Sequence, residues 1–334
     1  MGYFGRTAML IALTASTLSA ADGWTGLAFT DYYYIAGHHI PSSVGQNGFQ
    51  FRRIYLTYTT SVAEQLTARL RFEGASTDFT NRGAKITPFV KDAYLQWSRG
   101  EHKLTFGLSG TPTWALVEAH WGYRSVKKSP QDLHQFGSSR DFGISMRGPL
   151  GKGGYFVMLG NGAGISSETN RYKKVYAALN YPLGTRVNVE GYVDYEPGDE
   201  GRGLFSVFTL QGHVQVYLGA LQVGLLALRQ TLDNSTIIYN RGLFSVFGRW
   251  KLSEKWTGLG RIDYLPRINI ISNKSPNTPV WLIGKPLVLI AGFDYRVAEG
   301  LNLLPTVERV TYRSDDGQAP SADLTLKLTG YVRF

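Results

Sequence analysis

The chain has 334 residues, with 39 Gly, 20 Tyr, 17 Phe and 7 Trp, yet only 43% of its residues are hydrophobic. No apolar run of about 18 residues follows the N-terminus, which excludes a helical membrane protein. The absence of cysteine excludes disulfides, thiolate metal sites and cysteine nucleophiles, and the net charge of +10 comes without any nucleic-acid-binding motif.

The first predicted element is a secretory signal peptide over residues 1–21. Arg6 precedes the apolar stretch 8–18, and Ser19 and Ala21 are small residues at the positions expected before a cleavage site. The apolar stretch is too short for a membrane anchor. Cleavage would leave a mature chain over residues 22–334, with one positive charge fewer than the full chain.

The remainder of the chain alternates between strands and turns. Sixteen strands are expected, within a range of 14 to 18, and such even numbers are typical of bacterial transmembrane barrels. The expected strands are 23–36, 48–60, 65–79, 85–98, 102–110, 138–148, 154–162, 170–182, 185–196, 202–218, 220–231, 238–251, 255–266, 284–296, 300–312 and 322–334.

Apolar and polar residues alternate along these segments. In the last strand Leu326 and Leu328 alternate with Lys327 and Thr329, and the segments 65–79 and 185–196 repeat the pattern. A period of two places one set against lipid and the other in the lumen. A soluble β-sandwich would alternate as well, but the export signal, the strand lengths and the aromatic residues near strand ends favour a membrane barrel.

Connection lengths also alternate. The long connections 74–84, 111–137 and 267–283 follow odd strands, and most connections after even strands are short. This predicts extracellular loops at one end, and periplasmic turns with both chain termini at the other. The segment 148–154 (GPLGKGG) is expected to be an exceptionally long turn.

The loop after the fifth strand is the most informative segment. A short helical turn is expected over 115–123, ended by Pro130, and the segment carries the bases Arg124, Lys127 and Lys128. Sixteen-stranded porins, which this pattern resembles, fold the equivalent loop into the lumen. The acids Glu118 and Asp132 lie in the same segment.

Short motifs around this loop resemble the phosphate-selective porin O and P family. They are Gly107, Thr111-Pro112, Glu118, the segment 139–143 (SRDFG), and the strand segments 51–58 (FRRIYLTY) and 91–97 (KDAYLQW). The resemblance covers residues 50–150 and implies a channel whose arginines and lysines pass anions such as phosphate. Resemblance to sixteen-stranded porins also implies a homotrimer.

Basic side chains are expected to face the lumen along many strands. Arg69, Arg71 and Arg147 join the three loop bases as candidate selectivity residues, since rings of Arg or Lys select anions. The further inward-facing bases are Arg53, Lys103, Lys174, Arg186, Arg249, Arg261, Lys327 and Arg333. Alternatively, these bases pair with lumenal acids as a structural lining, and Arg140 is expected to pair with Asp141.

The sequence predicts a passive porin in the outer membrane of a Gram-negative bacterium. Neither a cofactor nor enzymatic activity is expected, because the six histidines lack zinc spacing and no Gly-x-Ser-x-Gly elbow occurs. The aromatic C-terminus Phe334 resembles the signal read by the barrel assembly machinery. Two alternatives remain: a barrel that scaffolds a partner, and a channel for apolar solutes, although no room for a plug precedes Trp24.

Overall fold

The computed structural model describes residues 23–75, 87–198, 205–233, 238–266, 285–313 and 319–334. The expected signal peptide over 1–21 lies outside the described residues, as do most of the predicted loops 74–84 and 267–283. In the described part of the chain, no helix is long and apolar enough to cross a membrane.

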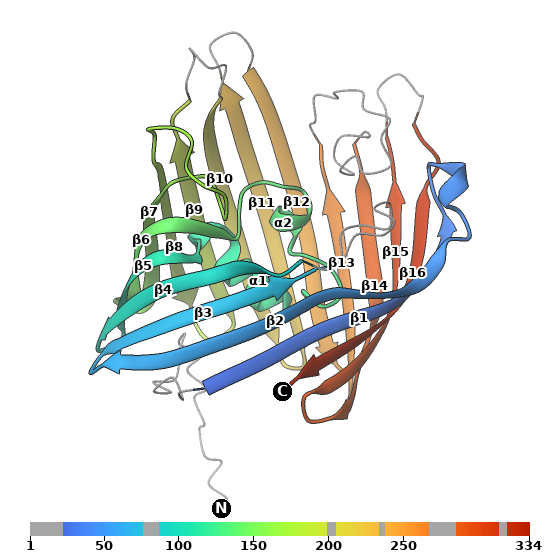
Figure 1. Cartoon of the computed structure of the whole chain (residues 1–334). Coiled ribbons are helices and arrows are strands. Elements are labelled where there is room, and N and C mark those ends of the chain that lie inside the picture. The colour runs from blue at the N-terminus through green and yellow to red at the C-terminus, as the bar shows by residue number, and fades with distance from the viewer. Residues whose placement is uncertain (1–22, 76–86, 199–204, 234–237, 267–284, 314–318) are drawn as a thin grey trace, which may run out of the picture.

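Sixteen antiparallel strands form one closed barrel, as the sequence predicted (Figure 1). Each strand pairs with its neighbours in sequence, and β1 pairs with β16 to close the ring. The strands are β1 Gly23–Gly37, β2 Asn47–Ala63, β3 Leu66–Gly74, β4 Phe89–Arg99, β5 His102–Gly110, β6 Arg140–Leu150, β7 Gly153–Gly160, β8 Lys174–Leu183, β9 Val187–Glu196, β10 Ser206–Leu218, β11 Leu221–Asp233, β12 Ile238–Lys251, β13 Trp256–Tyr264, β14 Leu287–Ala298, β15 Leu301–Thr311 and β16 Asp323–Arg333.

Helical structure in the described residues is confined to connections. The 3-10 turn η1 (Pro41–Ser43) follows β1, whereas η2 (Pro112–Trp114), α1 (Ala115–Trp121) and α2 (Pro130–Leu133) follow β5. Figure 1 shows α1 and α2 inside the ring of strands. The loop after the fifth strand therefore folds inward, as expected.

Tight turns join the strands at the end of the barrel where β1 starts and β16 stops. The backbone of Phe334 exchanges hydrogen bonds with Gly26 on β1, at 2.6 and 3.1 Å. The prediction of a long turn over 148–154 is wrong, because β6 continues to Leu150 and β7 starts at Gly153. Gly151, with φ of +59°, adopts the left-handed conformation that a two-residue turn requires.

The outer surface is apolar. Leu326 and Leu328 on β16 are each 45% exposed, whereas Thr329 on the inner face is fully buried, so the predicted alternation is confirmed there. Aromatic pairs lie near strand ends, with ring centroids 4.9 Å apart for Trp24 and Tyr58. A closed barrel leaves no strand edge unpaired, and an apolar exterior with aromatic girdles is suited to lipid.

The inner surface has two different halves. On β11–β15 a large part of it is apolar, with Leu226, Leu243, Phe247 and Ile290 buried in one cluster with side chains of the inward loop. The expectation that inner faces are water-facing is therefore wrong for this half. The inward loop needs an apolar core to pack against, and these strands provide it.

Candidate functional site

The inward loop runs from Gly110 to Arg140 and is built from short turns. Pro112 and Pro130 occupy the first helical turns of η2 and α2, where a missing N–H costs nothing. Pro130 thus begins a helix rather than ending one, contrary to the sequence prediction. The helix α1 ends at Trp121 because Gly122, with φ of +70°, provides a left-handed cap.

Apolar side chains seat the loop on the β11–β15 half of the barrel. Val117, Trp121, Val126 and Phe136 are almost wholly buried in the shared cluster. The indole Nε1 of Trp121 donates to the carbonyl of Lys127 at 3.0 Å, which satisfies its buried polar atom. The loop is therefore packed like a protein core and does not hang freely in the lumen.

Cationic side chains of the wall bind the backbone of the loop. Arg52 on β2 donates to the carbonyls of Ser125 and Val126, and Lys327 on β16 donates to the carbonyl of Val126 at 3.0 Å. Arg261 on β13 donates to the carbonyl of Lys128. These charge-assisted bonds fix the segment 125–128 to the arc of the barrel that runs from β2 through β16 to β13.

Asp263 on β13 is the centre of a fully buried anchor of the loop. Its carboxylate accepts from Arg261 Nε at 2.9 Å and from Ser245 at 2.6 Å. The ring Nε2 of the loop residue His134 lies 3.1 Å from the second oxygen. The Arg261, Asp263 and His134 side chains are each 0% exposed, so this network links the loop to the wall without solvent.

The opposite wall carries a basic cluster, which we call the wall cluster. Asp92 receives three guanidinium groups: Arg69 at 3.3 Å, Arg71 at 3.5 Å and Arg140. Glu73 pairs with Arg53 at 2.9 Å and Lys91 at 3.1 Å. Five cations share two carboxylates, so three positive charges of the wall cluster are in excess.

Two members of this region were missed by the sequence prediction. Arg52 and Lys91 were not expected to face inward, because each directly precedes an inward-facing residue, Arg53 or Asp92, and successive residues of a regular strand face opposite sides. The register shifts by one residue at Phe29/Thr30 and at Arg71/Phe72, which makes Arg52 and Lys91 the extra residues of β-bulges. A bulge lets two successive side chains face the lumen.

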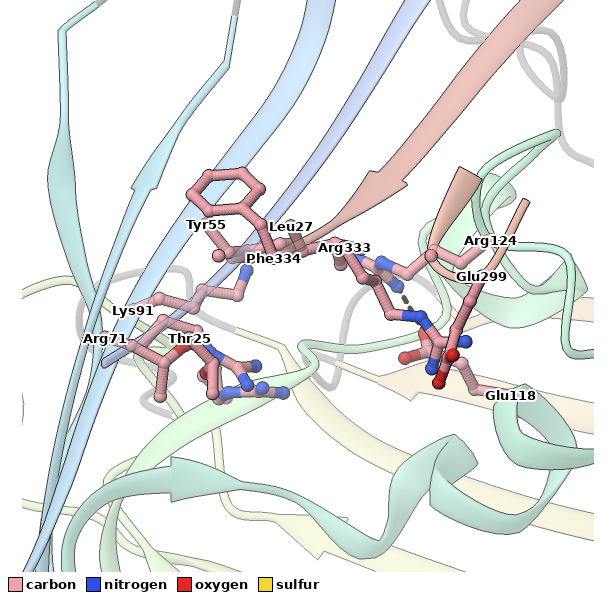
Figure 2. A pocket seen from close by; sticks show the side chains of 14 residues that line it. Thr25, Leu27, Tyr55, Arg71, Lys91, Glu118, Arg124, Glu299, Arg333 and Phe334 are labelled. Atoms are coloured by element: carbon pink, nitrogen blue, oxygen red, sulfur yellow. Dashed lines mark hydrogen bonds and ion pairs between the residues drawn. The ribbon is translucent and has the colours of Figure 1, made fainter. Parts of the chain in front are cut away.

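A cavity of about 660 Å³ separates the loop from the wall cluster. Arg71, Lys91 and Arg140 line it on the wall side, and Glu118 and Arg124 line it on the loop side. Figure 2 shows Arg71 and Lys91 on one side of the space, facing Arg124 and Glu118 on the other. The cavity also reaches Glu299, Arg333 and Phe334, at the end of the barrel that carries the tight turns.

The three loop bases have different surroundings. Arg124 lines the cavity and pairs with Glu118 and, at 3.0 Å, with Asp132. Lys127 points away to Glu308 on β15, at 2.6 Å, and so acts as an anchor. The side chain of Lys128 is 47% exposed, with Asp132 at 3.5 Å. Burial alone would raise the pKa of Asp132, but Arg124 and Lys128 outweigh it and lower that pKa.

The predicted wall bases are also separated. Arg69 and Arg71 belong to the wall cluster, whereas Arg147 lies apart, against the ring of Phe156 at 5.7 Å. Arg140 pairs with Asp92, so the prediction that it pairs with Asp141 is wrong. Asp141 instead accepts the hydroxyl of Tyr176 at 2.8 Å, because the start of β6 turns the two neighbouring side chains apart.

No family model and no curated relative matches the sequence. Solved structures do match. An anion-selective porin from Comamonas acidovorans has a TM-score of 0.70 and 11% identity, over 93% of this chain and 99% of that one. OmpF of Salmonella typhi, in complex with daunomycin, has a TM-score of 0.66 and 10% identity, over 93% of this chain and 97% of that one. The trimer form of OmpT from Vibrio cholerae has a TM-score of 0.65 and 11% identity, over 93% of this chain and 98% of that one.

At these identities the likeness shows the fold alone. It agrees with the closed ring, with the apolar exterior and with the loop folded inward after β5. The chain is therefore a sixteen-stranded β-barrel of the Gram-negative outer membrane with the porin fold.

Proposed function

We propose that the chain is a channel for passive diffusion of small hydrophilic solutes and that it prefers anions to cations. The observation that carries this is the wall cluster, in which five cations share two carboxylates beside the cavity. Four of the five cations are arginines, which keep their charge at all physiological pH values, so an excess of two positive charges over the two carboxylates is permanent even without Lys91. The anion-selective porin among the structural neighbours supports the same preference.

Phosphate is one candidate among the anions that this site would pass. A guanidinium binds a phosphate through two parallel hydrogen bonds, and Arg71 and Arg140 both line the cavity. An apolar solute fits the cavity poorly, because five of its lining side chains are cationic and two are acidic. We also propose that the chain is a channel and not an enzyme.

Export and assembly belong to the same proposal. Residues 1–21 would act as the signal peptide, and Phe334 would be read by the barrel assembly machinery in the periplasm. One structural neighbour is described as a trimer, which supports a homotrimer for this chain as well.

The test replaces Arg71 and Arg140 together with Gln and measures the zero-current potential in a KCl gradient. A unit charge about 6 Å from a passing ion contributes roughly 0.7 kcal/mol in water, or about 0.4 kcal/mol after screening at about 0.1 M salt. Two charges then change ion occupancy about fourfold, in opposite directions for chloride and potassium. The permeability ratio should therefore fall on the order of tenfold.

The control variant replaces the same two arginines with Lys, which keeps the charge and should keep the permeability ratio within about twofold. A double Gln variant with an unchanged ratio would contradict the assignment of selectivity to the wall cluster.

A further inference from the structure

A cluster of metal-ligating residues lies at the end of the barrel opposite the chain termini. One ring nitrogen each of His38 and His39 and a carboxylate oxygen of Asp323 all lie within 4.8 Å of one another. The histidines follow β1, and Asp323 is the first residue of β16. Figure 1 shows this region where β1 meets the η1 turn beside β16.

Asp323 is held in place by groups that a bound ion would leave intact. The backbone N–H of His39 donates to Oδ1 at 2.6 Å, and the hydroxyl of Tyr312 donates to Oδ2 at 2.5 Å. Ligating carboxylates in metal sites are oriented by hydrogen bonds of this kind. The carboxylate thus has an outer shell of partners already in position.

The two imidazoles are close to this carboxylate. Nδ1 of His39 lies 2.9 Å from Oδ1, and the rings of His38 and His39 stack with centroids 4.3 Å apart. The side chains of His39 and Asp323 are only 12% and 13% exposed, so the ligand atoms lie below the surface. A metal ion that binds Nδ1 of His39 displaces the proton on that nitrogen, and the proton is released to solvent.

We propose that His38, His39 and Asp323 form a binding site for one divalent transition-metal ion. Two imidazoles and one carboxylate suit Zn²⁺, which binds three protein ligands and leaves a fourth position to water. Magnesium and calcium are disfavoured because they prefer an all-oxygen set. The bound ion would join the segment after β1 to β16, across the seam that closes the barrel.

The experiment titrates ZnCl₂ into the full refolded protein in detergent, after treatment with a chelator, and follows the heat of binding. One Zn²⁺ per chain is expected, and His38→Ala and His39→Ala should each abolish this step. Tyr312→Phe keeps all three ligands but loses the outer hydrogen bond, so affinity should fall roughly 10–100-fold. His102→Ala is the matched control, because His102 lies on β5 beside Tyr155 and far from these residues.

Each variant is first checked for the folded barrel by its heat-modifiable mobility in gels. Absence of zinc binding by the unmodified protein would overturn the proposal, and would show that His39 and Asp323 form a hydrogen-bonded pair only. Zinc binding that persists in both histidine variants would overturn it too. Neither outcome bears on anion selectivity, which depends on the wall cluster of β2–β6, a set of residues that the zinc site does not share.

Discussion

Replacing Asp263 with Asn should release the inward loop. Arg261 is fully buried and its charge is balanced by Asp263, which also receives the loop residue His134. Removing one partner of a buried ion pair costs about 3–5 kcal/mol, because the other charge is left uncompensated. Since each 1.4 kcal/mol is roughly a factor of ten, the population with a displaced loop should rise at least a hundredfold.

Single-channel recordings and liposome swelling with sugars of increasing size would measure this change. The variant should show a larger or more variable conductance and should admit larger sugars. Asp194→Asn is the matched control, because Asp194 is equally buried and its ion pair with Lys174, at 3.3 Å, joins two neighbouring strands of the wall. Its link to the loop is indirect, through the hydroxyl of Tyr192, which lies 3.1 Å from Thr113. Identical conductance and size limits for Asp263→Asn and the unmodified protein would refute the anchoring role of Asp263.

Three further predictions concern the loop and its strand. Burial lowers the pKa of His120 from 6.5 to about 4, so the seated loop loses stability as the pH falls through that range, by roughly 3 kcal/mol in total. Rapid fluctuations of the channel current (flickering) should therefore increase in acid, and His120→Phe should reduce this increase in single-channel recordings without abolishing it, because burial lowers the pKa of the loop residue His134 as well. Lys127→Met removes the ion pair between the loop and Glu308, and it should increase the flickering of the channel current more than it changes the permeability ratio. Gly107 has a φ of +124°, and a Cβ added there would meet the backbone of β4. Gly107→Ala should therefore lower the free energy of unfolding, measured in urea, by about 1–3 kcal/mol. Gly191→Ala should leave it unchanged, because a Cβ at Gly191 would meet no atom.

Much of the barrel could be predicted because its pattern is local. Alternation of period two identifies a strand and its lipid face together, as in β16, where Lys327 and Thr329 face inward. The count of sixteen followed from turn residues between such segments. The boundary error at 148–154 arose because Gly and Pro were read as a turn, although both can lie in a strand near its end.

The wall cluster was predicted only in part, because bulges break the period on which the prediction depends. Arg69 and Arg71 lie on a regularly alternating strand and were identified. Lys91 sits at a bulge, and the sequence alone does not show where an extra residue enters a ladder. A pair of adjacent charged residues in an otherwise alternating strand, as at Lys91 and Asp92, is the signal that could have indicated it.

The partners of the loop bases depend on contacts between distant segments. Lys127 and Glu308 are 181 residues apart, and only the folded loop brings them together. The apolar inner face of β11 did have a local signal, since Leu225 and Leu226 are successive apolar residues on opposite faces. A strand that is apolar on both faces is buried on both, which indicates that something packs against its lumenal side.

The most direct test of the central claim is the zero-current potential of the unmodified protein in a planar bilayer with a KCl gradient. The three excess positive charges of the wall cluster predict a potential of the sign that chloride permeation produces, smaller at high salt. A potential of the sign produced by potassium would contradict the account, because the acids of the lumen would then dominate the path.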